Sequence, residues 1–194
     1  MVRNFLVFSK SISMSLSKNK RNVDDWHLSR DILDETLDAI SNHVTVNREY
    51  DIPYLAGYSE DGKTIYIDKH IPKFFKTTKN IKVDITRYLV LHEAVEKTLI
   101  DKLRLHYQYA HQIALRIEQD AIVADSISWK EYNDFMEKLI KEVADERIEN
   151  LPKDLDLTPY KDEKDFILLK RMAKSLKEEL NVSLIQSLNN CKNI

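Results

Sequence analysis

The stretch "LHEAVE" brings His92, Glu93 and Glu96 close together in the sequence. On a helix, a histidine and a carboxylate four residues apart lie one above the other, and such a pair can ligate a divalent cation. A glutamate beside them could act as a general base that deprotonates a water molecule. The residue types and their spacing therefore indicate metal-assisted hydrolysis.

The helical positions of these residues predict that two of them point into the core. With 100° per residue and Leu91 set at about 0°, the apolar residues of this helix occupy an arc of roughly 180°. His92 falls at about 100° and Glu96 at about 140°, inside that arc, and Glu93 lies near its edge at about 200°. Burying a carboxylate without a partner costs several kcal/mol, so a further group must satisfy Glu96.

The next predicted helix carries two more polar residues on an apolar face. His111 and Glu118 lie among the apolar residues of "YQYAHQIALRIEQDAI". If the connection near residues 105–106 is a tight helical hairpin, Glu118 comes to the level of His92. His111 then lies about 7 Å further along the axis, a gap that a crossing angle would close. Both residues are candidates for a third metal ligand.

A site without metal would use the same four residues differently. His92, Glu96, His111 and Glu118 would form a buried network of hydrogen bonds that fixes the packing of the two helices. A single histidine on an apolar face would favour the network without metal. Four inward polar groups support the metal site and the network without metal equally. The helical wheel alone does not choose between them.

The elements that position these residues are mainly helices. Only two glycines and four prolines, with 32% charged residues, favour long helices with few tight turns. Periodicity predicts about five helices, over roughly residues 29–44, 84–105, 107–124, 128–148 and 163–180. Alternation in "KTIYID" after the turn "EDG" predicts one short β-hairpin or strand pair ahead of the metal-site helix, and "KFFKTTKN" reads as a basic connector. The expected fold class is mainly α (α+β).

Domain organisation follows from the length of the chain. The 194 residues suit one domain with tails. We expect a flexible basic segment over 1–22, a single helical domain over 23–185 and a C-terminal tail over 186–194. The basic segment lacks acidic residues and is rich in Ser, Lys and Arg, so an organellar transit peptide is the alternative to a cytoplasmic protein.

Composition also excludes several classes of function. The formal charge of −2 gives no general basic field, so no nucleic-acid partner is expected. No apolar stretch approaches the roughly 20 residues that span a bilayer, so no membrane partner is expected either. The single cysteine, Cys191, rules out a disulfide within the chain, and a metal would be bound by His, Asp and Glu.

The block from about Tyr54 to Asp125 resembles the zincin-like metallopeptidases. The resemblance implies that His92 binds zinc, that Glu93 activates a water molecule and that Glu96 is the second ligand. In one branch of these metallopeptidases the third ligand is a glutamate on a following helix, and the resemblance implies this role for Glu118. It also implies a peptide or protein substrate, aligned by β-addition along an exposed edge of "GKTIYID". The same block resembles a group of uncharacterised bacterial and phage proteins.

The motif departs from the family at one position. The family's HExxH becomes HExxE here, because Glu96 stands where the second histidine would be. A carboxylate in place of an imidazole makes the donor set harder, so iron or manganese joins zinc among the expected divalent metals. The extra negative charge also predicts a weaker Lewis acid and slow or specialised hydrolysis.

Two other functions compete with the metallopeptidase. Glu93 with Glu96, and Glu142 with Asp145, resemble the paired acidic motifs of MazG-type nucleotide pyrophosphohydrolases, which hold magnesium. The other alternative is a non-catalytic helical protein for structure or interaction. In that case, aromatic residues could form a patch for a partner, although core packing suits them better. These residues are Tyr107, Tyr109, Trp129, Tyr132 and Phe135.

Overall fold

Helices form most of the structure, and the predicted mainly α (α+β) class is confirmed. The computed structural model describes residues 30–144 and 148–177. The helices are α2 (Arg30–Ser41), α3 (Thr86–Leu103), α4 (Tyr107–Ala124), α5 (Trp129–Ala144) and α6 (Thr158–Asp162), and residues 166–177 are also helical. The predicted segments 1–22 and 186–194 lie outside the described residues.

The strands form two small sheets rather than the predicted single pair. In the first sheet the strand order is β1 (Thr45–Asn47), β3 (Thr64–Ile67), β2 (Ala56–Tyr58). Strand β3 pairs with β1 in parallel and with β2 in antiparallel. The second sheet is the antiparallel pair β4 (Phe74–Lys76) and β5 (Lys82–Asp84).

Two predictions about the strands are wrong. The segment "GKTIYID" does not offer a free edge, because its strand β3 is the central strand and is paired on both sides. The supposed connector "KFFKTTKN" contains β4. Strands of three or four residues are too short for a clear alternation of apolar and polar side chains, and tertiary pairing decides their neighbours.

The two helices that carry the site form an antiparallel hairpin. Helix α4 spans the predicted residues, whereas α3 begins two residues later than expected. Asp84 belongs to β5, and its carboxylate accepts the N–H of Thr86 at 2.9 Å just before the helix. Helix α3 ends at Leu103, and the capping residue Arg104 has a φ of 56°, in the left-handed region typical of helix ends.

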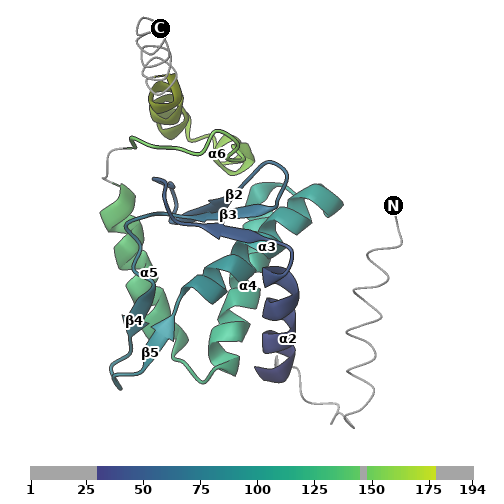
Figure 1. Cartoon of the computed structure of the whole chain (residues 1–194), viewed down its shortest axis with the longest axis vertical. Coiled ribbons are helices and arrows are strands. Elements are labelled where there is room, and N and C mark those ends of the chain that lie inside the picture. Colours follow the sequence, from purple (N-terminus) through teal and green to yellow (C-terminus); the bar gives the residue numbers. More distant parts are fainter. Residues whose placement is uncertain (1–29, 145–147, 178–194) are drawn as a thin grey trace, which may run out of the picture.

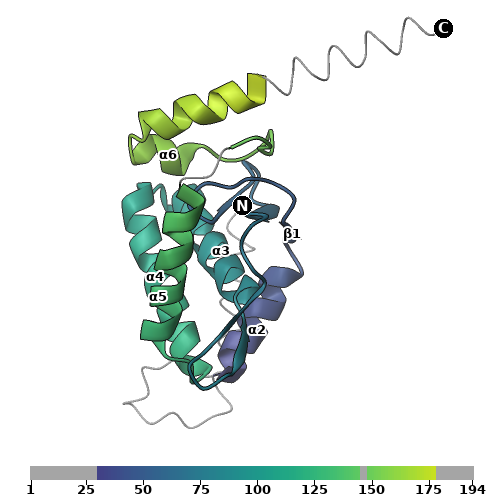
Figure 2. The same ribbon diagram turned by 90° about the vertical axis from the view of Figure 1, so that its left-hand side faces the viewer.

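Helix α5 runs beside α4 and completes the helical layer, as Figure 2 shows. Its start follows the prediction, since Ser128 Oγ accepts the N–H of Glu131 at 3.4 Å. The aromatic residues named as a possible partner patch mostly pack in the core, which is the role that suited them better from the sequence. Tyr107 and Tyr132 are buried, Trp129 and Phe135 pack against the core, and Tyr109 alone of the five is exposed.

The segment after α5 returns to the sheet and covers it. Figure 1 shows α6 and the helix over 166–177 on the side of the sheet opposite α5. Leu155, Tyr160 and Met172 pack with Ile52 and Tyr66 in a hydrophobic cluster separate from the main core. This cluster joins the end of the described chain to strand β3.

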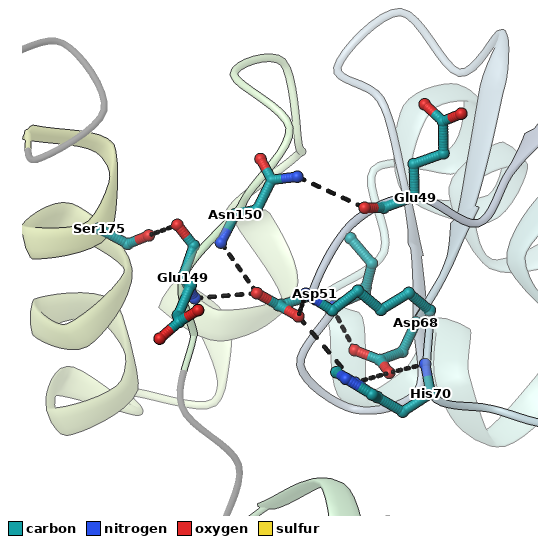
Figure 3. Close-up of polar contacts among 9 residues, drawn as sticks. Glu49, Asp51, Asp68, His70, Glu149, Asn150 and Ser175 are labelled. Atoms are coloured by element: carbon teal, nitrogen blue, oxygen red, sulfur yellow. Dashed lines mark hydrogen bonds and ion pairs between the residues drawn. The ribbon is translucent and has the colours of Figure 1, made fainter. Parts of the chain in front are cut away.

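A buried carboxylate fastens the same segment. Asp51 Oδ2 accepts the backbone N–H groups of Glu149 and Asn150 at 2.9 and 2.8 Å, and Ser175 Oγ donates to the Glu149 carbonyl at 3.0 Å (Figure 3). Lys69 Nζ lies 2.6 Å from Asp51 Oδ1. The contacts link three segments that are far apart in the sequence.

None of the helices in the described part of the chain has the length and apolar character needed to span a membrane.

Candidate metal centre

Three side chains from α3 and α4 converge on one point. His92 Nε2 lies 3.1 Å from His111 Nδ1 and 3.5 Å from Glu96 Oε2, and His111 Nδ1 lies 3.0 Å from Glu96 Oε2. Ligand atoms bound to one ion at about 2.1 Å in a tetrahedron lie about 3.4 Å apart. The three donor atoms thus have the mutual spacing of a metal site.

The helix hairpin produces this convergence. His92 and Glu96 lie one turn apart on the buried face of α3, as the helical wheel predicts, and Glu96 is only 3% exposed. His111 reaches them from the first half of α4 and keeps 35% of its side chain exposed. The cluster therefore combines two buried ligand candidates with one that faces solvent.

The structure separates the two candidates for a third ligand. Glu118 is also buried, but it lies on the other side of the His92 ring, where its Oε2 is 2.8 Å from His92 Nδ1. Since a carboxylate only accepts hydrogen bonds, Nδ1 carries the proton. Glu118 therefore orients His92, and the opposite ring nitrogen faces Glu96 and His111.

Two tyrosines that the sequence did not identify as site residues complete the site. Tyr58 on β2 donates to Glu96 Oε1 at 3.0 Å, which leaves Oε2 facing the histidines. Tyr132 on α5 donates to Glu118 Oε1 at 2.5 Å. Burial, with the neighbouring carboxylate as the second cause, raises the pKa of both hydroxyls, so they remain donors. The only signal in the sequence was that buried carboxylates need donors.

Burial and hydrogen bonding act in opposite directions on the pKa of Glu96. Burial alone would raise the pKa of this carboxyl, but hydrogen bonds with His111 and His92 lower it below the ordinary value. For His92, burial alone would lower the pKa of the imidazole. The hydrogen bonds with Glu118 and Glu96 outweigh burial and raise this pKa well above the ordinary value of 6.5. The centre thus stabilises positive charge at the imidazole of His92.

Glu93 occupies a different environment from Glu96. Its carboxylate lines the cavity beside the cluster, and no hydrogen bond from the described residues reaches it. Burial, followed by the charge of Glu96, raises its pKa to about 8. A divalent cation nearby would lower this pKa again, because positive charge favours the ionised carboxylate.

A cavity of about 230 Å³ opens onto the cluster. His92, Glu96 and His111 all line it, together with Glu93. Catalytic metal sites keep one position open to water or substrate, whereas structural sites are closed by protein ligands. A cation held here would have a side that faces the cavity.

The donor set fits a divalent cation. Two imidazole nitrogens and one carboxylate oxygen converge, and lone pairs this close together need a proton or a cation between them. Imidazole and carboxylate together suit zinc, iron and manganese. The hydrogen bond that His92 donates to Glu118 and the one that Tyr58 donates to Glu96 are the supporting contacts that metal ligands commonly have.

A second group of Asp51, Asp68 and His70 has similar spacing but different partners. Lys69 already supplies a positive charge at 2.6 Å from Asp51, and backbone N–H groups occupy the other carboxylate oxygens. We therefore interpret this group as a structural cross-link between segments.

Comparisons of the chain with protein-family models, with curated proteins and with solved structures found no match. The resemblance to zincin-like metallopeptidases therefore rests on the motif residues alone, and the case for a function depends on the geometry of the centre.

Proposed function

We propose that the protein is a metal-dependent hydrolase that cleaves an amide bond, with metal-activated water attacking the carbonyl carbon. The observation that carries the proposal is the convergence of His92, Glu96 and His111 at the wall of a cavity. A divalent cation held by these residues, with zinc first and iron or manganese as alternatives, would lower the pKa of a water molecule and polarise a carbonyl group. Glu118 is proposed to position His92 and not to bind the cation.

Glu93 is the proposed catalytic base. Its carboxylate is next to His92 in the sequence, borders the cavity and has no competing hydrogen bond among the described residues. It would take the proton from water as the oxygen attacks the carbonyl carbon. The same proton would then pass to the leaving nitrogen as the carbon–nitrogen bond breaks.

The nucleotide pyrophosphohydrolase alternative receives less support. Glu142 lies on the exposed side of α5, where it pairs with Lys138 at 3.6 Å, and it does not line the cavity. Asp145 lies outside the described residues. Of this second acidic pair, the described Glu142 is therefore not part of the cavity that holds Glu93 and Glu96, and the geometry of the described residues lends this alternative no support.

The non-catalytic alternative makes a different prediction about metal. A purely structural network would bind no ion, whereas the proposed hydrolase should contain about one divalent cation per chain. Metal analysis of the chain purified without a histidine tag, by inductively coupled plasma mass spectrometry, tests this directly. We expect His92→Ala to lose the metal, and His106→Ala, whose exposed side chain lies in the loop between α3 and α4, to keep it.

The catalytic role of Glu93 needs a separate measurement. We expect Glu93→Gln to retain the metal and to lose at least about 100-fold of the hydrolysis rate, because general bases contribute roughly that much. Unchanged hydrolysis in Glu93→Gln would refute the assignment of the base. A wild-type chain that binds no divalent metal would refute the hydrolase proposal as a whole.

A further inference from the structure

The end of the sheet edge nearest the centre, from Tyr58 to Glu60, is already paired with the chain itself. The outer side of β2 bonds to residues 154–156, where the Asp156 N–H donates to the Tyr58 carbonyl at 2.9 Å and the Glu60 N–H donates to the Asp154 carbonyl at 2.8 Å. Ser59 and Leu155 form an antiparallel bridge between these hydrogen bonds. The other edge, on β1, is separated from β2 by the central strand β3. An extended peptide therefore finds the end of this edge, from Tyr58 to Glu60, already occupied, and only the short stretch at Ala56 and Gly57 borders the cavity.

The segment that covers β2, residues 151–160 (the covering segment), is packed firmly into the fold. Leu151, Leu155 and Tyr160 are almost fully buried in the second hydrophobic cluster. Asp156 pairs with the buried Lys97 of α3 at 2.6 Å. Displacing the segment to admit a peptide strand would expose this apolar surface and leave a buried charge without its partner.

Most of the unburied residues that line the cavity lie on α4 and α5, which points to a mouth between these two helices. They are His111 and Leu115 on α4, and Trp129, Asn133, Glu137 and Ile140 on α5, while Asp156 beside β2 is also half-buried. Tyr54 completes this rim. A mouth formed by two helices has no backbone N–H or C=O groups for pairing with a strand, because those groups bond within the helices.

The lining of the cavity favours apolar groups and disfavours anions. Its deeper walls carry Leu55, Leu89 and Met136, which offer apolar contact. The described lining includes the carboxylates Glu93, Glu96, Glu118, Glu137 and Asp156 and no lysine or arginine. An anionic side chain placed away from the proposed metal would meet repulsion from these carboxylates, and no lysine or arginine of the lining would offset it.

From these observations we infer that the site takes compact amides whose apolar group fills the cavity through the mouth between α4 and α5, rather than polypeptide strands or acidic substrates. The inference rests on the proposed hydrolase function and names its substrate class. A cavity of about 150 Å³ holds a benzene molecule. The volume of about 230 Å³ here admits one aromatic or branched aliphatic group with the adjoining amide.

Hydroxamates test the substrate class without requiring turnover, because the same metal-binding group can carry different side chains. The zinc-loaded full chain is titrated by calorimetry with N-acetyl-phenylalanine hydroxamate and with N-acetyl-glutamate hydroxamate. A third probe carries eight alanine and serine residues in place of the acetyl group of the phenylalanine compound. We expect the first probe to bind at least 10-fold more tightly than either of the others.

A change of charge at the mouth provides a matched pair of variants. Glu137→Lys on the exposed surface of α5 should improve binding of the glutamate probe at least 5-fold and leave the phenylalanine probe within 2-fold. Lys138→Gln, one residue further and outside the cavity lining, should change neither affinity.

The outcomes separate the two proposals. A chain that takes up none of zinc, iron and manganese refutes the hydrolase proposal, and the substrate class falls with it. Zinc uptake with equal or tighter binding of the glutamate probe or of the long peptide probe overturns the substrate class alone. Zinc uptake with the expected order of affinities supports the inference, whatever rate of hydrolysis is measured.

Discussion

His92 is the residue on which the candidate centre depends. One ring nitrogen donates to Glu118, and the other faces Glu96 and His111. The carboxylate of Glu118 thereby fixes both the orientation of the ring and the position of its proton. The chain of contacts continues from Glu118 to Tyr132, so three helices determine the direction of a single lone pair.

We predict that Glu118→Gln weakens zinc binding by about 10- to 100-fold, as is typical when a partner of a ligating histidine is changed. The amide keeps the size of the carboxylate but no longer supplies its negative charge. Competition with a chelator of known affinity measures the effect. Glu137→Gln, on the rim of the same cavity, is the control and should bind zinc like the wild type. If both variants bind zinc alike, Glu118 does not position His92.

At the scale of the elements, small residues on α4 allow the centre to form. Ala110, Ala114 and Ala121 are fully buried and share the face of α4 that carries Glu118, at spacings of three and four residues. Short side chains allow α3 and α4 to approach closely enough for the 2.8 Å contact between His92 and Glu118. The site is thus a consequence of helix packing as well as of its own residues.

Enlarging one of these alanines should separate the helices. We predict that Ala114→Leu lowers the free energy of unfolding by about 1 to 3 kcal/mol, the usual effect of overpacking, and weakens zinc binding. Urea denaturation and the same chelator competition measure the two effects. Ile113→Leu, on the exposed side of α4, should change neither quantity.

The pairing of α3 with the covering segment gives a second prediction at this scale. Lys97 is buried and lies 2.6 Å from Asp156 and 3.1 Å from the more exposed Asp101. Asp156→Asn should lower the free energy of unfolding by about 2 to 4 kcal/mol, because it removes one partner of a buried pair. Asp101→Asn should cost only about 0 to 1 kcal/mol, as expected for an exposed pair. Equal losses in urea denaturation would contradict the importance of the covering segment.

At the scale of the whole molecule, the chain closes on itself through Asp51. This buried carboxylate binds the backbone at residues 149–150, about a hundred positions further along the sequence. Its pKa is lowered below the ordinary value of 3.8, because hydrogen bonds with Lys69, Asn150 and Glu149 outweigh the effect of burial, which alone would raise it. The closure is therefore sensitive to acid.

A carboxylate whose pKa is lower in the folded protein than in the unfolded chain stabilises the fold. This stabilisation is fully present above the ordinary pKa and is lost as the pH falls through the pKa of the folded state. We therefore predict that Asp51→Asn lowers the free energy of unfolding at pH 7 by about 2 to 3 kcal/mol, since the hydrogen bonds are made to a charged acceptor. The difference from the wild type should narrow below about pH 4. Urea denaturation at pH 7 and pH 3 measures both values, with Asp120→Asn on the exposed side of α4 as the control. A difference that does not change with pH would contradict the role of the ionised carboxylate.

The sequence by itself determined the helices and the inward direction of the key residues. Helix α4 was predicted with its observed bounds, and the buried positions of His92 and Glu96 followed from 100° per residue, because helical periodicity is local. It also selected His111 and Glu118 as the facing residues on the next helix.

Tertiary structure decided the rest, because those features depend on contacts between distant segments. It divided the roles of His111 and Glu118, since the crossing of α3 and α4 brings one to each side of the His92 ring. It supplied Tyr58 and Tyr132 from other elements, and it placed β3 in the centre of its sheet. It also covered the edge of β2 with residues 154–156, a pairing for which no local pattern exists, because backbone groups of any sequence can form it.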